Sequence, residues 1–272
     1  MNLTRIDSER VFQDIFRNVR KEKKEGFASN IFPLQPLFSK AISEGRLFYV
    51  DVDGNCFFLE DKGDHFNVFF ASDRSVDLPA VLNSIHSEAV LTKPLVLEHL
   101  IREGKDVSLG EPSAVLKRMA RTVPEFPQIG SRAELPYPFH IQKAEQRDVY
   151  DLQEIFSEFF NPLTERIPDE EELLSLISRK GVFWAVCNGK KAGFIIFEKE
   201  GANLHLRYWW IAPGFRGGGI GSGLMRKFFE AASGTRRQFL WVFSDNENAI
   251  KRYRHYGFDF DGTQDDIYVL KN

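Results

Sequence analysis

The sequence has only two cysteines, no long apolar run and no excess of positive charge. Cys56 and Cys187 each lie inside an apolar, strand-like run, which favours buried thiols in a reducing compartment over a disulfide framework or a metal site. No segment approaches the ~18 apolar residues of a membrane-spanning helix, and the first residues lack an apolar stretch followed by a small-residue cleavage site, so we expect no secretory leader. The formal net charge of -3 offers no positive field for nucleic acid or anionic membrane. We therefore expect a soluble, cytoplasmic protein that binds neither.

One pattern in the chain occurs twice. ISEGRLFYVDVDG, from Ile42 to Gly54, is matched 135 residues later by ISRKGVFWAVCNG, from Ile177 to Gly189. In both places the pattern ends a helix and opens a hairpin. FQDIF and LQEIF form a second matched pair upstream, in the same order. The repetition indicates two similar domains.

The boundary between these domains is predicted from a proline-rich stretch. Residues 123–140 hold four of the twelve prolines and little periodicity, which is typical of a linker. We expect one domain over residues 1–135 and a second over residues 136–272.

The order of helices and strands in the second half can be predicted from the sequence. Two amphipathic helices come first, followed by a hairpin at Asn188 and Gly189, a third strand, and then strand and helix in alternation. This order predicts an α/β fold with a mixed sheet that has helices packed on it.

A glycine-rich stretch, IAPGFRGGGIGSGL, follows the third strand of this half and precedes a helix. Such a turn gathers unpaired backbone N–H groups at the positive end of a helix, where a phosphate can bind. Neither the dinucleotide GxGxxG pattern nor the P-loop fits the register. The pattern [RQ]xxGx[GA] does fit, with Arg216, Gly219 and Gly221. The stretch resembles the acetyl-CoA signature of the GCN5-related N-acetyltransferase (GNAT) family.

A second block strengthens the resemblance. NENAIKRYRHYGF, from Asn246 to Phe258, is similar to the family's NxxAxxxYxxxGF pattern. The likeness covers about residues 139 to 272. It implies two acyl-CoA N-acyltransferase-like domains, each with a mixed central sheet flanked by helices, and acetyl-CoA or another short acyl-CoA as cofactor. In the family, the glycine turn holds the pyrophosphate and the preceding strand end holds the pantetheine. The resemblance thus assigns these residues to the cofactor: Trp210, Ile211, Arg216, Gly217, Gly218, Gly219, Ile220, Gly221, Asn246 and Ala249.

The catalytic residues are predicted from the same resemblance. Tyr253 stands where the family's tyrosine protonates the departing thiolate, although it could instead pack its helix on the sheet. His205 stands where many members carry a glutamate base; a histidine can accept a proton near neutral pH, or be satisfied by hydrogen bonds alone. Asp245 and solvent are the alternatives. Strand alternation predicts that His205 shares a face with Arg207, Trp209 and Ile211.

The first half repeats the sheet pattern without the glycine turn. Residues 65–85 pass from strand to helix without a glycine, so we expect a degenerate GNAT-like domain. It would either cover an apolar flank of the second domain or contribute a wall of the acceptor site.

The function predicted from the sequence is acetyl transfer to a primary amine of a small molecule or peptide, by direct attack in a ternary complex. The alternatives are a non-catalytic acyl-CoA-binding regulator and an aminoacyl or peptidyl transferase of tandem GNAT type. Tyr208, Trp209 and Trp210 favour an acceptor with an apolar or cationic body. The sequence leaves open which amine it is, and whether the protein is a monomer or a homodimer.

Overall fold

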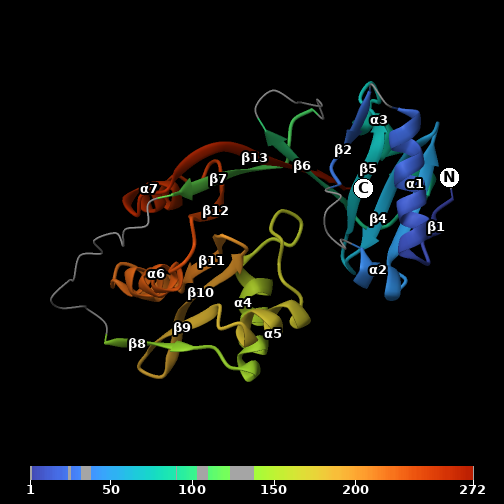
Figure 1. Ribbon diagram of the computed structural model, residues 1–272. Coiled ribbons are helices and arrows are strands. Elements are labelled where there is room, and N and C mark those ends of the chain that lie inside the picture. The colour runs from blue at the N-terminus through green and yellow to red at the C-terminus, as the bar shows by residue number, and fades with distance from the viewer. Residues whose placement is uncertain are drawn as a thin grey trace. The chain divides into compact units, whose positions relative to one another are not determined.

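The computed structural model describes residues 2–23, 26–31, 38–89, 91–102, 110–122 and 138–271. The chain forms two compact units (Figure 1): unit 1 is Met1–Leu116 with Thr263–Asn272, and unit 2 is Lys117–Gly262. Strands β7 (Ala114–Arg121) and β13 (Asp259–Leu270) each pass from one unit into the other. Each half of the chain therefore lends strand residues to the unit built mainly by the other half. The predicted boundary between residues 135 and 136 lies outside the described residues and stays a prediction.

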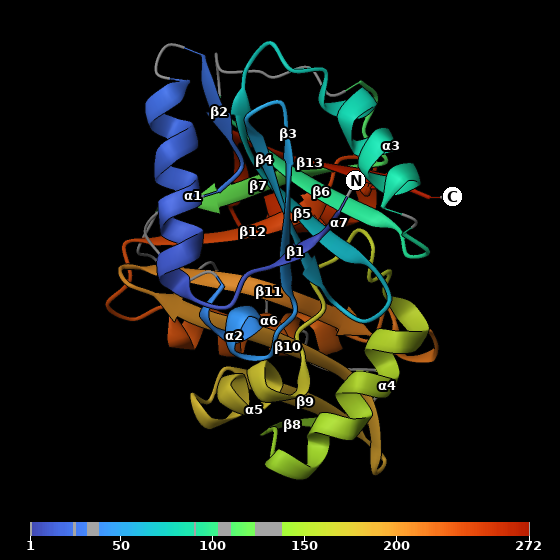
Figure 2. The ribbon, with the colours of Figure 1, turned by 90° about the vertical axis from the view of Figure 1, so that its right-hand side faces the viewer.

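Unit 1 is a sheet with helices on both faces. Its strand order is β1-β3-β4-β5-β6, followed by the end of β13, and β2 pairs with β5. Figure 2 shows α1 and α3 on opposite sides of this sheet. The strands are β1 (Thr4–Arg5), β2 (Phe27–Ser29), β3 (Leu47–Val52), β4 (Asn55–Asp61), β5 (Phe66–Asp73) and β6 (Leu95–Arg102), and the helices are α1 (Glu9–Glu22), α2 (Ser39–Ser43) and α3 (Leu78–Glu88).

The apolar run of β4 reflects burial on both faces. Phe57 and Leu59 pack into the core under α3, whereas Phe58 packs into the core under α1. Each of these three side chains is fully buried. A strand covered on both faces is apolar throughout rather than at alternate positions.

Unit 2 repeats this arrangement. Its strand order is β7-β12-β11-β10-β9-β8, with the start of β13 beyond β7. Helix α6 covers one face, and α4 and α5 cover the other (Figure 1). The elements are β8 (Phe139–Lys143), α4 (Val149–Phe159), α5 (Glu170–Ser178), β9 (Val182–Cys187), β10 (Lys190–Glu200), β11 (Asn203–Ile211), α6 (Ile220–Ala231), β12 (Arg237–Phe243) and α7 (Glu247–His255). The predicted fold class, a mixed sheet flanked by helices, is confirmed.

The repeated sequence pattern corresponds to repeated structure. The hairpins β3–β4 and β9–β10 begin and turn at equivalent positions, 135 residues apart. Their turn residues have positive φ angles: 54° at Asp53 and 72° at Gly54, 49° at Asn188 and 74° at Gly189. Two successive positive φ angles are what a two-residue hairpin of type I′ requires, and Asn, Asp and Gly tolerate them best.

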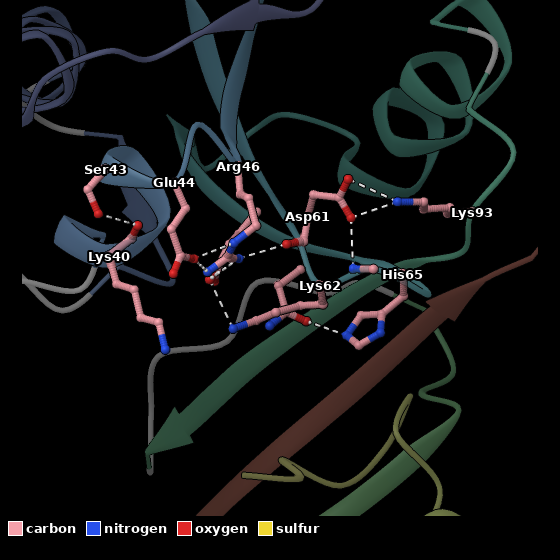
Figure 3. Close-up of polar contacts among 11 residues, drawn as sticks. Lys40, Ser43, Glu44, Arg46, Asp61, Lys62, His65 and Lys93 are labelled. Carbon is pink, nitrogen blue, oxygen red and sulfur yellow. Dashed lines mark hydrogen bonds and ion pairs between the residues drawn. The ribbon is translucent and has the colours of Figure 1, made fainter. Parts of the chain in front are cut away.

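The polar residues at one end of the unit 1 sheet are ion-paired with one another (Figure 3). Arg46 donates to the Asp61 carbonyl at 2.8 Å and approaches the Glu60 carboxylate at 3.4 Å. Lys93 contacts both oxygens of the Asp61 carboxylate, at 2.7 and 2.9 Å. These pairs tie the start of β3 and the segment before β6 to the end of β4.

Two further features of the described residues concern the cysteines and the apolar character of the helices. Cys56 and Cys187 are buried and form no disulfide. Among the helices of the described segments, none has both the length and the apolar character needed to span a bilayer.

Candidate functional site

Strands β11 and β12 separate before either of them ends. Their parallel pairing joins residues 203–206 to residues 237–240 and stops there, although β11 continues to Ile211 and β12 to Phe243. The pair Leu206 and Leu240 is the point of separation. Beyond it, no strand of the described residues pairs with the facing edges of β11 and β12. Carboxyl ends of strands that separate in an α/β sheet are where ligands bind in such folds.

A β-bulge at Arg207 changes which way the side chains of β11 point. Ile196 pairs with Tyr208, but the next residue, Phe197, pairs with Leu206, so Arg207 is an extra residue.

The bulge overturns one prediction. Trp209 and Ile211 pack in the core under α6, while Tyr208 and Trp210 pack in the core under α4 and α5. Arg207 also lies on the α5 side, where it pairs with Glu172. His205, two residues before Arg207, shares its side. The expectation that His205 lies on one face with Trp209 and Ile211 was therefore wrong, because the extra residue inverts the alternation.

The backbone of β11 beyond the bulge presents its polar groups alternately to β10 and to the unpaired edge. The Ala212 N–H donates to the Ala192 carbonyl at 3.0 Å, and Ile211 faces Gly193 in the register. In an antiparallel pair of this kind, the N–H and C=O groups of Ile211 and Trp209 point away from β10. Those of Trp210 point toward β10. The unpaired edge is thus lined by the backbone of Trp209 and Ile211.

The glycine turn leaves the first turn of α6 without a side-chain cap. Gly219 is the N-cap residue, with φ 77°, and Gly217 has φ 80°. The first helical bond runs from the Gly223 N–H to the Gly219 carbonyl at 3.2 Å. The amides of Ile220 and Gly221, ahead of it, have no intrahelical acceptor, which is the arrangement that binds anions.

Arg216 and Gly221 also have local structural roles. Arg216 Nε donates to the Ile211 carbonyl at 3.1 Å and so ties the turn to the strand end. A Cβ atom at Gly221 would lie 2.8 Å from Cζ2 of Trp209. Glycine at this position therefore lets the indole ring pack under the turn, a reason that the sequence pattern did not reveal.

Trp209 and Tyr253 lie together on the α6 side of the sheet. Their ring centroids are 5.8 Å apart. The Trp209 Nε1 atom is buried and has no hydrogen-bond partner among the described residues. Burial raises the pKa of Tyr253 to about 12, so its hydroxyl keeps its proton at neutral pH.

His205 lies on the other side of the sheet. Its Nδ1 atom is 2.9 Å from Oε1 of Glu200, and its ring stacks on Phe239 with centroids 4.3 Å apart. His205 immediately precedes Leu206, so it stands at the point where β11 and β12 separate.

The first residue of the second block, Asn246, has a capping role. Asn246 is the N-cap residue of α7, and its side chain accepts the Ala249 N–H at 3.2 Å. Asp245, the alternative base, is exposed at the end of β12. The capping bond explains Asn246 locally, while the predicted cofactor contacts of Asn246 and Ala249 stay predictions.

In unit 1 the two strands that correspond to β11 and β12, β5 and β6, also separate, but β2 occupies the edge of β5 that is left. Strands β5 and β6 pair in parallel only over residues 66–68 and 95–97, although β5 continues to Asp73. On the edge that β6 leaves, β2 pairs with residues 71–73. The edge of β5 beyond the point of separation is therefore paired in unit 1, whereas the corresponding edge of β11 in unit 2 is not.

Asn30 completes this closure. Its Oδ1 accepts the Phe70 N–H at 2.7 Å, and its Nδ2 donates to the carbonyls of Val68 and Glu98 at 3.1 and 3.0 Å. One side-chain amide thus satisfies the backbone groups of both separating strands. Sequence analysis missed Asn30, because no local motif marks it.

The helix that follows β5 also differs from α6. Its N-cap residue is Asp77, whose carboxylate accepts the Ala80 N–H at 3.1 Å. A negative charge already occupies this helix end, whereas the N-cap residue of α6 in unit 2, Gly219, makes no side-chain capping bond. Unit 1 therefore lacks both features that make unit 2 a candidate site.

Comparison with known proteins defines the class of unit 2. Residues 149–258 match the acetyltransferase (GNAT) family, and this segment contains the bulged strand, the glycine turn and Tyr253. The segment is thus similar to this family, in the region where the two sequence blocks predicted the resemblance.

Individual relatives agree with this assignment. An uncharacterized N-acetyltransferase of Methanocaldococcus jannaschii is 37% identical over 90 residues, which are 29% of this chain and 39% of that protein. The chain thus spans about two fifths of the length of this curated relative.

Two solved structures share the fold over nearly the whole chain. A GCN5-related N-acetyltransferase from Sphaerobacter thermophilus has a TM-score of 0.57 at 15% identity and covers 100% of this chain and 96% of its own. A tandem GNAT protein from the clavulanic acid biosynthesis pathway, solved without AcCoA, has a TM-score of 0.56 at 10% identity and covers 99% and 98%. The predicted tandem arrangement is thus confirmed at the level of the fold.

Proposed function

We propose that this protein transfers an acetyl group, or another short acyl group, from coenzyme A to a primary amine. The observation that carries the proposal is the bare N-terminus of α6 at the end of a strand whose outer edge is unpaired. A helix N-terminus can bind a diphosphate, and an unpaired strand edge can form hydrogen bonds with the amides of an extended chain. Acyl-CoA contains both, joined end to end.

The residues of unit 2 fit this donor in a definite order. Within the predicted pyrophosphate site, from Arg216 to Gly221, the amides of Ile220 and Gly221 at the helix end would donate to the pyrophosphate. The backbone of Trp209 and Ile211 would bind the pantetheine amides along the unpaired edge. This placement moves the contact predicted at Trp210 to its neighbour, because the Trp210 backbone points toward β10. The thioester, at the far end of the pantetheine arm, would then lie near the point of strand separation.

The side chains around that point suit an acyl transfer. His205, on the α5 side, takes the proton of the attacking amine at Nε2. The amine nitrogen forms a bond to the thioester carbon, and the C–S bond breaks with its electron pair on sulfur. Tyr253, on the α6 side, donates a hydrogen bond to the departing sulfur.

The raised pKa of Tyr253 refines its predicted role. A thiol loses its proton near pH ~8.5, whereas burial raises the pKa of Tyr253 to about 12. Transfer of the phenol proton to a thiolate is therefore uphill. We assign Tyr253 as a hydrogen-bond donor that stabilises the sulfur's charge, in place of the full proton transfer expected from the sequence.

The first test is the number of acetyl-CoA molecules bound per chain. We expect one, because unit 2 has the unpaired edge and bare helix end, while Asn30 and Asp77 close the corresponding features of unit 1. Titration calorimetry with acetyl-CoA measures the stoichiometry directly. No binding would overturn the proposed function, and two equivalent sites would contradict the closure of unit 1.

The second prediction concerns Tyr253→Phe. This variant should bind acetyl-CoA as tightly as the parent, and its kcat should fall by about ten- to a hundredfold, because a donor to developing charge is lost. Acceptors for the assay come from a thermal-shift screen of an amino acid, an amino sugar, a polyamine and a peptide amine in the presence of CoA. Tyr150→Phe, at an exposed position on α4, is the matched control. Unchanged turnover in Tyr253→Phe would refute the donor role, and acetyl-CoA binding without turnover of any amine would favour a regulator.

A further inference from the structure

We propose that Glu200 is a positioning residue for His205: its carboxylate holds the imidazole by Nδ1 so that Nε2 is presented to the acceptor amine. The inference rests on the proposed function, since it concerns how the proposed base is prepared for its role.

The geometry restrains the ring from two directions. Glu200 ends β10, and a short turn through Gly201 leads into β11. This turn brings Glu200 Oε1 to 2.9 Å from Nδ1 of His205. The Phe239 ring lies against the imidazole at an interplanar angle of 16°. The Glu200 carboxylate at its edge and the Phe239 ring on its face together hold the His205 imidazole in one orientation.

The carboxylate also decides which nitrogen carries the proton. An ionised carboxylate only accepts hydrogen bonds, so the neutral imidazole must have its hydrogen on Nδ1. The hydrogen bond from His205 lowers the pKa of Glu200 and outweighs the opposing effect of burial, so Glu200 is ionised at neutral pH. Nε2 then has a lone pair and can accept a proton. The same division of labour operates between the acid and the histidine of a Ser-His-Asp triad.

His205 and Glu200 stand at the place where the reaction would occur. His205 faces Phe239 across the last paired stretch of β11 and β12, next to Leu206. Its side chain retains 18% of its exposure. No hydrogen-bond partner of Nε2 occurs among the described residues. The ring nitrogen that must act is thus the one that the protein does not engage.

The surrounding charges argue against a metal ion at the same place. Oxygen atoms of Glu198 and Glu200 and a ring nitrogen of His205 lie within 4.8 Å of one another, which is close enough for a cation. However, Glu198 is already paired with Arg207 at 2.9 Å and with Arg179 at 3.3 Å. These guanidinium groups supply the positive charge that a metal would otherwise bring.

The charged groups around His205 come from every element packed near it. They are Glu198 and Glu200 on β10, Arg207 on β11, Glu172 and Arg179 at α5, Arg118 of β7, which lies over Phe239, and Arg237 of β12, which pairs with Asp261 as Arg118 does. Of these, Glu200 alone forms a hydrogen bond with the imidazole within the described segments. Its effect on the ring can therefore be separated from that of the other charges.

The test measures the tautomer of His205 directly. Proteins with ¹⁵N-labelled histidine give ring signals from six residues, and His205→Gln identifies the signal of interest. In the full-length parent with acetyl-CoA added, we expect the Nδ1–H form. In Glu200→Gln, whose amide can donate as well as accept, we expect the Nε2–H form to gain population. Glu198→Gln removes the same charge from the facing position and should leave the tautomer unchanged.

Kinetics with the best amine from the thermal-shift screen provide the second readout. Glu200→Gln should lower kcat on the order of tenfold with unchanged acetyl-CoA affinity, because part of the general-base contribution of ~10²–10⁴ is lost. A parental tautomer and kcat in Glu200→Gln would overturn the inference. If His205→Gln also keeps the parental kcat, the base assignment fails as well. If acetyl-CoA does not bind to the parent, the proposed function itself fails.

Discussion

Gly219→Asp is expected to weaken acetyl-CoA binding by at least about a hundredfold. In this variant a carboxylate stands at the N-cap of α6, where the proposed pyrophosphate meets the first amides of the helix. Two like charges about 4 Å apart repel by ~4 kcal/mol at the effective dielectric constant of a protein surface. The aspartate would also accept one of the helix-end N–H groups itself, as Asp77 accepts the Ala80 N–H in unit 1. The variant thus gives unit 2 the cap that unit 1 already has.

Gly219→Asn is the matched control for charge. Gly219 has φ 77°, a conformation that Asn and Asp tolerate better than other residues with a side chain. The two variants therefore share shape, capping capacity and backbone strain, and differ in one negative charge. We expect Gly219→Asn to bind acetyl-CoA within about tenfold of the parent, since it retains a neutral helix end.

Calorimetry with acetyl-CoA on both variants, with thermal melts to verify folding, measures this effect. Equal affinities for Gly219→Asp and Gly219→Asn would show that charge at this helix end does not matter. The pyrophosphate would then bind elsewhere.

The glycine turn shows which structural features can be predicted from the local sequence. The pattern around Arg216 to Gly221 predicted a strand, a tight turn and a helix start, and these elements occur at the expected positions. All of these features depend on neighbours within about ten residues. The reason for Gly221 was not accessible, because it lies in the packing of Trp209 against the helix.

The bulge at Arg207 marks the limit of periodicity as a guide. Alternation along β11 would place His205, Trp209 and Ile211 on one face, and one extra residue was enough to separate them. The residues RYWW do not predict a bulge, because the bulge arises from the register between β11 and β10. The consequence for chemistry is large: His205 and Tyr253 now approach the proposed thioester from opposite sides of the sheet, one toward the amine and one toward the sulfur.

Asn30 illustrates contacts that no local pattern contains. The repeat in the sequence showed that the first half has the same hairpin, and the absence of glycine showed that its turn differs. The filling of its strand opening depends on Asn30 meeting Phe70 and Glu98, which are 40 and 68 residues away in the chain. Such closure is a property of the tertiary fold alone.

The second large effect is expected on the stability of unit 2, because part of β7 belongs to this unit although it precedes the predicted boundary. A chain that begins at residue 136 contains the whole GNAT-like sequence block, yet it lacks the part of β7 that belongs to unit 2. Met119 of that strand is fully buried in the core under α6. Arg121 donates to the Tyr256 carbonyl at 2.9 Å and lies 4.9 Å from the Phe229 ring centroid. Loss of one buried methionine side chain alone costs about 2–5 kcal/mol, and the edges of β12 and β13 lose their partner as well.

We therefore expect the fragment 136–272 to show no cooperative thermal unfolding, because whole domains are stable by only about 5–15 kcal/mol. The matched fragment, 112–272, retains β7 and differs in no other strand, so it should melt cooperatively and at a higher temperature. Circular dichroism melts of the two fragments measure the difference. An identical Tm would show that β7 is dispensable to unit 2, and the linker near residue 136 would then be the true domain boundary. A stable fragment 112–272 beside an unfolded fragment 136–272 would place the functional limit of the domain at β7, upstream of the linker that composition alone suggests.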